Sequence, residues 1–133
     1  MPKVKDIMSK TVVTLDISNS AFDVVREMMN RDIGSVIVTQ KGRGVVGVVT
    51  KGDILRETIM KKADPQKIKA EDVMSRPVVS IDPDATLQEA SGLMSKNNVS
   101  KLPVISEGRL LGIVTSTDII RKSGRKKIAE DLV

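Results

Sequence analysis

The chain alternates between short runs of aliphatic residues and longer stretches in which apolar residues recur at helical spacing. In the first half, β-branched and aliphatic runs cover residues 11–15, 35–39 and 45–50, and an amphipathic stretch separates the first two runs. The second half repeats this order. A further helix is expected to begin near Lys51 and near Ser116. Each half therefore predicts the order strand–helix–strand–strand–helix, an α/β (α+β) arrangement with a hairpin of buried strands.

The amphipathic helices have recognisable starts. The stretch TLQE places Thr86 and Glu89 as a capping box, and Ser20 and Asp23 occupy the same positions in the first half. The methionines among the apolar helix positions are soft and adaptable, which predicts an interface between copies of the chain. The apolar helix positions are Val24, Val25, Met28, Met29, Leu87, Ala90, Leu93 and Met94.

The two halves are copies of one pattern. Residues Val4–Asp16 align with Ala70–Asp82, and six of the thirteen positions are identical. Residues Val46–Arg56 align with Leu111–Arg121, with six of eleven identical. A single unit of this size buries little surface, so the two repeats are expected to share a core. The expected divisions are a first repeat at 1–62, a linker at 63–69, a second repeat at 70–122 and a basic tail at 123–133.

Composition excludes several classes of site. The 133 residues include no cysteine and no histidine, which removes thiolate chemistry together with the commonest general base and metal ligand. The carboxylates form no evident catalytic pair, so we expect a binding protein rather than an enzyme, with no metal site and no required cofactor. No apolar run approaches the roughly 20 residues that cross a bilayer. The N-terminus has no signal-peptide pattern, so a cytoplasmic protein without membrane contact is expected.

The net charge is +5, and basic residues gather in the run RKSGRKK at 121–127. A basic surface suits an anionic partner, so a nucleic-acid-binding or protein-interaction module is the alternative function. Phe22 is the only aromatic residue, which leaves no stacked platform for single-stranded nucleic acid. A salt titration of binding to random DNA or RNA separates this alternative from small-molecule binding.

The stretch GVVTKGD at 47–53 returns as GIVTSTD at 112–118. In each copy a threonine ends a strand, and an aspartate follows three residues later where a helix begins. A carboxylate can accept from both hydroxyls of a ribose, and the threonine hydroxyl with the N–H groups of the helix start can hold a phosphate. The same pair is also a helix cap that needs no ligand. The spacing alone leaves both interpretations open.

Together these motifs resemble a pair of CBS domains. The resemblance rests on VKDIMS, GVVTKGDIL, DVMSRPVVSID, KLPVI and GIVTSTDII, which match in order over about Val4 to Lys122. It implies a stand-alone regulatory module whose repeats pack sheet to sheet with pseudo-two-fold symmetry. It also implies clefts between the repeats that bind an adenosine-containing ligand such as AMP, ADP, ATP or S-adenosylmethionine, and a disc-like homodimer of two modules. Ligand binding would shift the packing and be reported to a partner.

The resemblance assigns candidate ligand contacts to the matching positions of both repeats. The repeated motif implies ribose and phosphate contacts, and the first strand of each repeat implies adenine contacts through its backbone. Two lysines are candidate phosphate contacts, with a solvated side chain as the alternative for each. The candidate residues are Thr50, Lys51, Asp53, Thr115, Ser116, Asp118, Val13, Thr14, Val79, Ser80 and Lys101.

The two clefts are predicted to differ. Some nucleotide-binding members of the family carry a basic pair just before the second strand of the repeat. This chain has Asn97 and Asn98 at that place in the second half, and Arg31 and Asp32 in the first. Because Asp32 would repel a phosphate, the cleft that contains Asp118 is predicted to be the tighter site.

Overall fold

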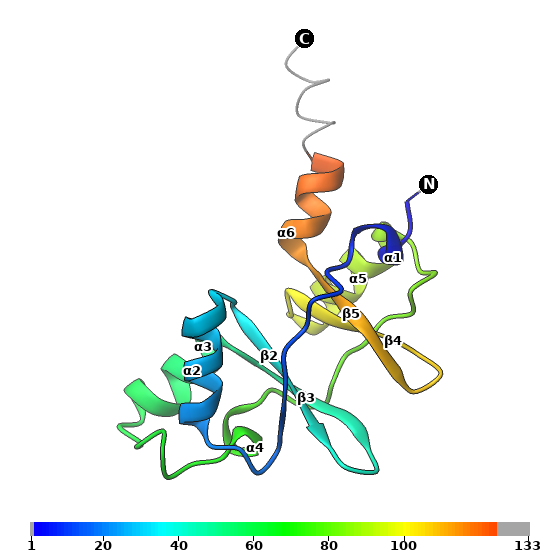
Figure 1. The fold of residues 1–133 in the computed structure, drawn as a ribbon. Coiled ribbons are helices and arrows are strands. Elements are labelled where there is room, and N and C mark those ends of the chain that lie inside the picture. The colour runs from blue at the N-terminus through cyan, green and yellow to red at the C-terminus, as the bar shows by residue number, and fades with distance from the viewer. Residues whose placement is uncertain (1, 125–133) are drawn as a thin grey trace. The chain divides into compact units, whose positions relative to one another are not determined.

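The computed structural model describes residues 2–124, and most of the basic tail expected at 123–133 lies outside the described residues. The chain forms two compact units. One is Val12–Val78, and the other joins the N-terminal residues up to Thr11 to the described residues from Val79 onward. Both units combine helices with a small sheet (Figure 1), which confirms the predicted α+β fold in two repeats. None of the helices within residues 2–124 has the length and apolar character needed to span a bilayer.

The unit Val12–Val78 is built on a three-stranded sheet with the strand order β1-β2-β3. Its elements are β1 (Thr14–Asp16), α2 (Ala21–Arg31), β2 (Ser35–Gln40), β3 (Gly44–Thr50), α3 (Lys51–Ile54), the π-helix η1 (Leu55–Met60) and α4 (Ala70–Val73). Strand β1 pairs in parallel with β2, and β2 pairs antiparallel with β3. The predicted hairpin is therefore present, and the helix expected near Lys51 begins there.

The second unit has the same plan with a smaller sheet, in which β4 and β5 pair antiparallel. Its elements are α1 (Val4–Ile7), α5 (Leu87–Asn97), β4 (Lys101–Ser106), β5 (Arg109–Thr115), α6 (Ser116–Ile119) and the π-helix η2 (Ile120–Gly124). The second predicted hairpin and the helix expected near Ser116 are therefore also present.

The first strand expected in the second half is the run PVVSI at 77–81, the counterpart of residues 11–15, and it does not form. A single residue of this run, Ile81, bridges to Val104 of β4 in the parallel sense. Its N–H donates to one carbonyl of β4 and its carbonyl accepts from one N–H of β4, both at 3.0 Å. Pro77, the first residue of the run, and Pro83, two residues after its end, have no N–H to donate, which limits pairing on this side of β4.

Two short helices, α1 and α4, exchange places between the repeats. Each lies at the start of one repeat in sequence and packs on the other. Helix α1 lies at the start of the first repeat in sequence, yet the Val4 N–H donates to the Ala85 carbonyl at 2.9 Å, in the unit built on the second repeat. At the equivalent place in the other unit, the Ala70 N–H of α4 donates to the Asn19 carbonyl at 2.7 Å. Val4 and Ala70 are both fully buried. Each repeat is therefore completed by a short helix from the start of the other.

The compact units consequently divide the chain differently from the expected repeats. The segment 63–69, expected as a linker, packs within the unit Val12–Val78. Its carbonyls receive the first N–H groups of α2, from Phe22 to Pro65 at 3.0 Å and from Ala21 to Ile68 at 2.9 Å. These bonds satisfy two of the donors that a helix start leaves without an internal partner.

Each hydrophobic cluster lies within one unit. The first contains Ala21, Val24, Met28, Val36, Val38, Val49, Ala70 and Val73, and the second contains Val4, Ile81, Leu87, Ala90, Met94, Leu102, Val104, Val114 and Ile119. Met28 and Met94 are only 6% exposed, so the prediction that they lie at an interface is wrong: their side chains fill these cores. Met29, one position further along α2, is 77% exposed.

The two long helices begin with different caps. In α2 the capping box is complete, because the Asp23 N–H donates to Ser20 Oγ and Asp23 Oδ2 accepts from the Ser20 N–H. In α5 only half of the predicted box forms. The Glu89 N–H donates to Thr86 Oγ1 at 3.0 Å, but the Glu89 side chain makes no reciprocal bond. The longer glutamate side chain remains exposed at the surface instead.

Candidate ligand-binding site

The repeated Thr-x-x-Asp motif stands at the junction of a strand and a helix in both units. Thr50 is the last residue of β3 and the N-cap of α3, and Thr115 has the same place between β5 and α6. Each threonine hydroxyl accepts from the aspartate N–H, at 3.3 Å for Asp53 and 3.2 Å for Asp118. Each aspartate Oδ2 accepts from the threonine N–H, at 2.8 and 3.0 Å respectively. The capping interpretation is therefore correct for both copies.

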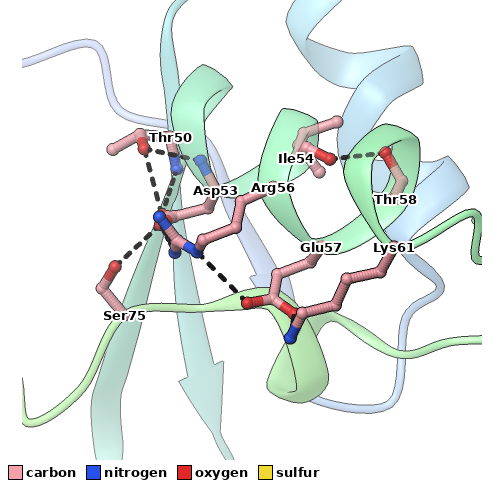
Figure 2. Close-up of polar contacts among 8 residues, drawn as sticks. All are labelled: Thr50, Asp53, Ile54, Arg56, Glu57, Thr58, Lys61 and Ser75. Atoms are coloured by element: carbon pink, nitrogen blue, oxygen red, sulfur yellow. Dashed lines mark hydrogen bonds and ion pairs between the residues drawn. The ribbon is translucent and has the colours of Figure 1, made fainter.

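Beyond these caps, Asp53 is surrounded by donors (Figure 2). Its Oδ1 accepts from Arg56 Nη2 at 2.7 Å and from Ser75 Oγ at 3.0 Å, while its Oδ2 also accepts from Thr50 Oγ1 at 3.0 Å. Asp53 is only 4% exposed. With the Thr50 N–H, four donors share the two oxygens, which fills the acceptor capacity of a carboxylate.

Asp118 has far fewer partners than Asp53. Its Oδ2 accepts from the Thr115 N–H, and no other donor among residues 2–122 contacts either of its oxygens. The residue is also partly exposed rather than buried. One carboxylate oxygen of the second repeat therefore keeps its capacity to accept hydrogen bonds from a bound molecule.

Arg56 is itself held by a chain of charges along η1 (Figure 2). Its Nε donates to Glu57 Oε1 at 3.3 Å, and Glu57 Oε2 accepts from Lys61 Nζ at 2.7 Å. The hydrogen bond to Asp53, followed by that to Glu57, raises the pKa of Arg56. The hydrogen bond from Lys61 is the main cause that lowers the pKa of Glu57. The guanidinium is thus fixed between two carboxylates.

The predicted lysine and serine contacts have different surroundings. Lys51 is exposed and Ser116 is half-buried, and their N–H groups donate to the Gly34 and Ser100 carbonyls at 3.2 and 2.9 Å. Lys101 is the first residue of β4 and is half-buried. The N–H groups of the first helical residues are therefore already bonded within the protein.

The predicted adenine contacts lie at the start of β1 and in the corresponding run of the second repeat. Val13 is half-buried, and its carbonyl accepts from the Ile37 N–H at 2.9 Å, while Thr14 begins β1 and is exposed. Val79 is half-buried and Ser80 is exposed, in the run that forms no strand.

Two grooves that sequence reasoning did not identify lie at equivalent places in the two units. The first, about 340 Å³, is lined by Val25, Met28, Met29, Asp32, Lys51, Ile54 and Leu55. The second, about 350 Å³, is lined by Ser91, Met94, Ser95, Asn98, Val99, Ser116, Ile119 and Ile120. The first is mainly apolar, whereas serines stand at the positions of Val25, Met29 and Lys51 in the second. Only the alignment of the repeats could have indicated that these positions share a groove.

Asp32 and Asn98 have a backbone role that the sequence did not reveal. Both are C-caps in the left-handed region, with a φ of 51°. Asparagine and aspartate tolerate this conformation better than most residues. Helix termination therefore explains why an aspartate or asparagine stands at each place. That one is charged and the other neutral is a separate difference between the two grooves. Among residues 2–124, no cluster of three acidic side chains is placed to hold a metal ion.

Comparison with known proteins agrees with this architecture. The family model for the CBS domain matches residues 4–59 and again residues 70–125. The chain therefore belongs to the CBS domain family, whose paired domains are regulatory modules. It is 29% identical over 119 residues to the uncharacterized protein MK0525 of Methanopyrus kandleri, covering 89% of this chain and 61% of that protein. The chain thus spans less than two thirds of the length of that relative.

Two solved structures are similar to most of this chain. One is the CBS domain pair of protein MJ0100 in complex with 5'-methylthioadenosine and S-adenosyl-L-methionine, with 30% identity and a TM-score of 0.80. That match covers 91% of this chain and 98% of the other. The other is a hexameric CBS-CP12 protein from bloom-forming cyanobacteria, with 26% identity and a TM-score of 0.88, covering 96% of this chain and 74% of that one.

Proposed function

We propose that this CBS pair is a non-catalytic, cytoplasmic sensor that binds an adenosine-containing ligand, and that Asp118 is the residue that accepts from the ribose hydroxyls. The observation that carries the proposal is the difference between the two motif aspartates. Asp118 is partly exposed and has one hydrogen bond from the described residues, whereas Asp53 has four. A ribose diol needs an acceptor that is not already occupied.

The chemistry of a similar protein supports the same ligand class. The CBS pair of MJ0100 was crystallised with two adenosine compounds, and it is 30% identical to this chain over nearly its full length. The two compounds share an adenine and a ribose and differ in charge. The recognised part is therefore proposed to be the nucleoside, with Val79 and Ser80 offering backbone groups to the base and Lys101 and Ser116 near the 5' substituent.

A thermal-shift panel tests the proposal. The panel contains AMP, ADP, ATP, NAD, S-adenosylmethionine and methylthioadenosine, with guanosine monophosphate as the control. A ligand at 100 times its dissociation constant adds about 2.7 kcal/mol to the unfolding free energy, so at least one adenosine compound is expected to raise the melting temperature. The absence of any shift with all six compounds would contradict the proposal.

The nucleic-acid alternative is separated by its salt dependence. Binding to random DNA would weaken steeply as salt increases, because each phosphate contact releases counterions. The binding of a neutral nucleoside releases no such counterions, so its affinity is expected to change little with salt. Salt-sensitive DNA binding without any adenosine response would favour the alternative function.

We also propose that the chain forms a homodimer through the exposed apolar side of α2 and η1. Met29, Ile59 and Met60 are 77%, 70% and 76% exposed, and Leu55, the first residue of η1, is also exposed. The similar CBS-CP12 protein is a hexamer, so assembly of such modules has a precedent. Exposed apolar side chains that gather on neighbouring helices favour burial against a second surface.

A further inference from the structure

The two repeats carry the same motif aspartate, but only the first copy is enclosed by its own unit. Arg56 and Ser75 both donate to Asp53 Oδ1, and Thr50 donates twice to Oδ2. A ligand diol that approached Asp53 would have to displace at least one of these donors. The charged donor, at 2.7 Å, makes the shortest of the four contacts.

The second repeat contains the same residue types at the equivalent places, with different contacts. Ser9 is the counterpart of Ser75, since their N–H groups donate to equivalent carbonyls of β5 and β3, both at 2.9 Å. The Ser9 hydroxyl nevertheless donates to the Thr11 carbonyl rather than to Asp118. Arg121 is the counterpart of Arg56, and no carboxylate among residues 2–124 forms an ion pair with it.

The neighbouring residue explains why only one arginine is fixed. Glu57 lies beside Arg56 and accepts from its Nε, which aims the guanidinium at Asp53. The alignment of the repeats places Lys122 at the position of Glu57. A lysine repels the adjacent Arg121 instead of holding it. The change of charge from Glu57 to Lys122 therefore explains why Asp53 is bonded to an arginine and Asp118 is not.

We propose that Arg56, positioned by Glu57, is a built-in competitor for ligand at Asp53, and that it closes the first repeat to ribose-bearing ligands. This inference rests on the proposed function, because it assumes that the open aspartate, Asp118, binds such a ligand. The chain then binds one adenosine ligand, although its sequence contains two copies of the motif. Arg56 is the residue that determines which copy of the motif binds the ligand.

Calorimetric titration with adenosine tests the inference, because adenosine has no phosphate that could recruit an arginine for its own charge. The wild type is expected to bind one adenosine per chain. Arg56→Ala is expected to bind two, since Asp53 Oδ1 loses its charged donor. Arg121→Ala is the matched control and is expected to keep a stoichiometry of one. If Arg56→Ala does not fold, Glu57→Lys is the second variant and is expected to give the same gain with Arg56 and Asp53 still present.

The outcomes distinguish this inference from the proposed function. A variant Arg56→Ala or Glu57→Lys that folds and still binds only as many adenosine molecules as the wild type overturns the inference. A gain of one site in the variant, over a wild type that binds none, supports the closure of Asp53 and contradicts the role of Asp118. If Arg56→Ala instead loses a site for AMP that the wild type has, Arg56 is a phosphate contact and the inference is wrong.

Discussion

Gly112 occupies a position where a side chain has no room. A Cβ atom there would lie 2.5 Å from the Ser9 carbonyl oxygen and 3.0 Å from Met8 Sδ. The nearest atom belongs to the backbone and cannot rotate away. Gly112→Ala is therefore expected to lower the free energy of unfolding by about 1–3 kcal/mol, as overpacking does in well-packed cores. Urea denaturation followed by circular dichroism measures this change.

Two other glycines serve as controls for this prediction. At Gly47 the added atom would meet the side chain of Met74, which can rotate, so Gly47→Ala is expected to cost less than Gly112→Ala. Gly92 lies within α5 and has no atom within 4 Å of its Cβ position, so Gly92→Ala is expected to stabilise the protein by roughly 0.5–1 kcal/mol. Equal stabilities for the three variants would contradict the packing described for β5.

The site residues show where reasoning from the sequence ends. The motif identified Thr50, Asp53, Thr115 and Asp118, and the caps that it predicted are present in both copies. From the sequence, the contrast between the two clefts is predicted from the charge of Asp32, and this stays a prediction. The structural contrast comes from Arg56 and Ser75, and Ser75 is separated from Asp53 by 22 positions in the chain. Such a contact is set by packing rather than by local spacing.

At the scale of elements, Asp23 makes the start of α2 sensitive to pH. Hydrogen bonds from Asn19 and the Ser20 backbone lower the pKa of Asp23 below its ordinary value of 3.8. The ionised side chain thus stabilises the fold above about pH 4, and this contribution is lost as the pH falls through the lowered pKa of the folded state. Asp23→Asn is expected to cost roughly 0.5–1 kcal/mol at pH 7 and nothing in strong acid.

The corresponding helix of the other unit supplies the control. Glu89 makes no return bond to the start of α5, so Glu89→Gln is expected to leave the unfolding free energy nearly unchanged at either pH. Thermal unfolding at pH 7 and at pH 2.5 measures both variants. A cost for Asp23→Asn that persists unchanged in acid would show that charge at this position has no part in the cap.

Elements with a strong local signal could be predicted, and elements defined by contacts could not. The hairpins and the helices α2 and α5 follow from periodicity and caps. The helices α1 and α4 have four residues each, which is too short for any periodicity. The local signal of each is one aspartate. Its side chain accepts from the backbone N–H three positions earlier, at 2.7 Å for Asp6 and 2.8 Å for Asp72.

At the scale of the whole molecule, the position of α1 makes the N-terminus a structural part of the second repeat. Val4 is fully buried among residues such as Leu87 and Leu102. Val4→Ala is therefore expected to destabilise that unit by roughly 1–3 kcal/mol and to increase amide exchange in β4 and β5 rather than in β2 and β3. Hydrogen–deuterium exchange with mass spectrometry resolves the two hairpins.

A substitution in α4 tests the same exchange of helices in the unit Val12–Val78. Val73 of α4 is fully buried in the unit Val12–Val78, so Val73→Ala is expected to increase exchange in β2 and β3. If Val4→Ala increased exchange in β2 and β3 instead, α1 would pack on the first repeat, at whose start it lies in sequence.

The proposed homodimer makes a prediction about mass in solution. Ile59→Glu places a charge in the exposed apolar face of η1, where burial of an unpaired carboxylate is costly. The variant is expected to be a monomer of 14.4 kDa by light scattering at a concentration where the wild type has twice that mass. Lys41→Glu, in the turn between β2 and β3, changes charge away from this face and is expected to keep the dimer. A monomeric wild type would contradict the proposed dimer.

Calorimetric titration of AMP into Asp118→Asn and Asp53→Asn tests the central claim most directly. Both substitutions keep the shape of the side chain and remove its charge. If Asp118 holds the ribose, Asp118→Asn weakens AMP binding by at least about tenfold, which corresponds to about 1.4 kcal/mol and to the loss of hydrogen bonds to a charged group. Asp53→Asn leaves the affinity as it is in the wild type. Loss of AMP binding in Asp53→Asn, with binding intact in Asp118→Asn, would contradict the account.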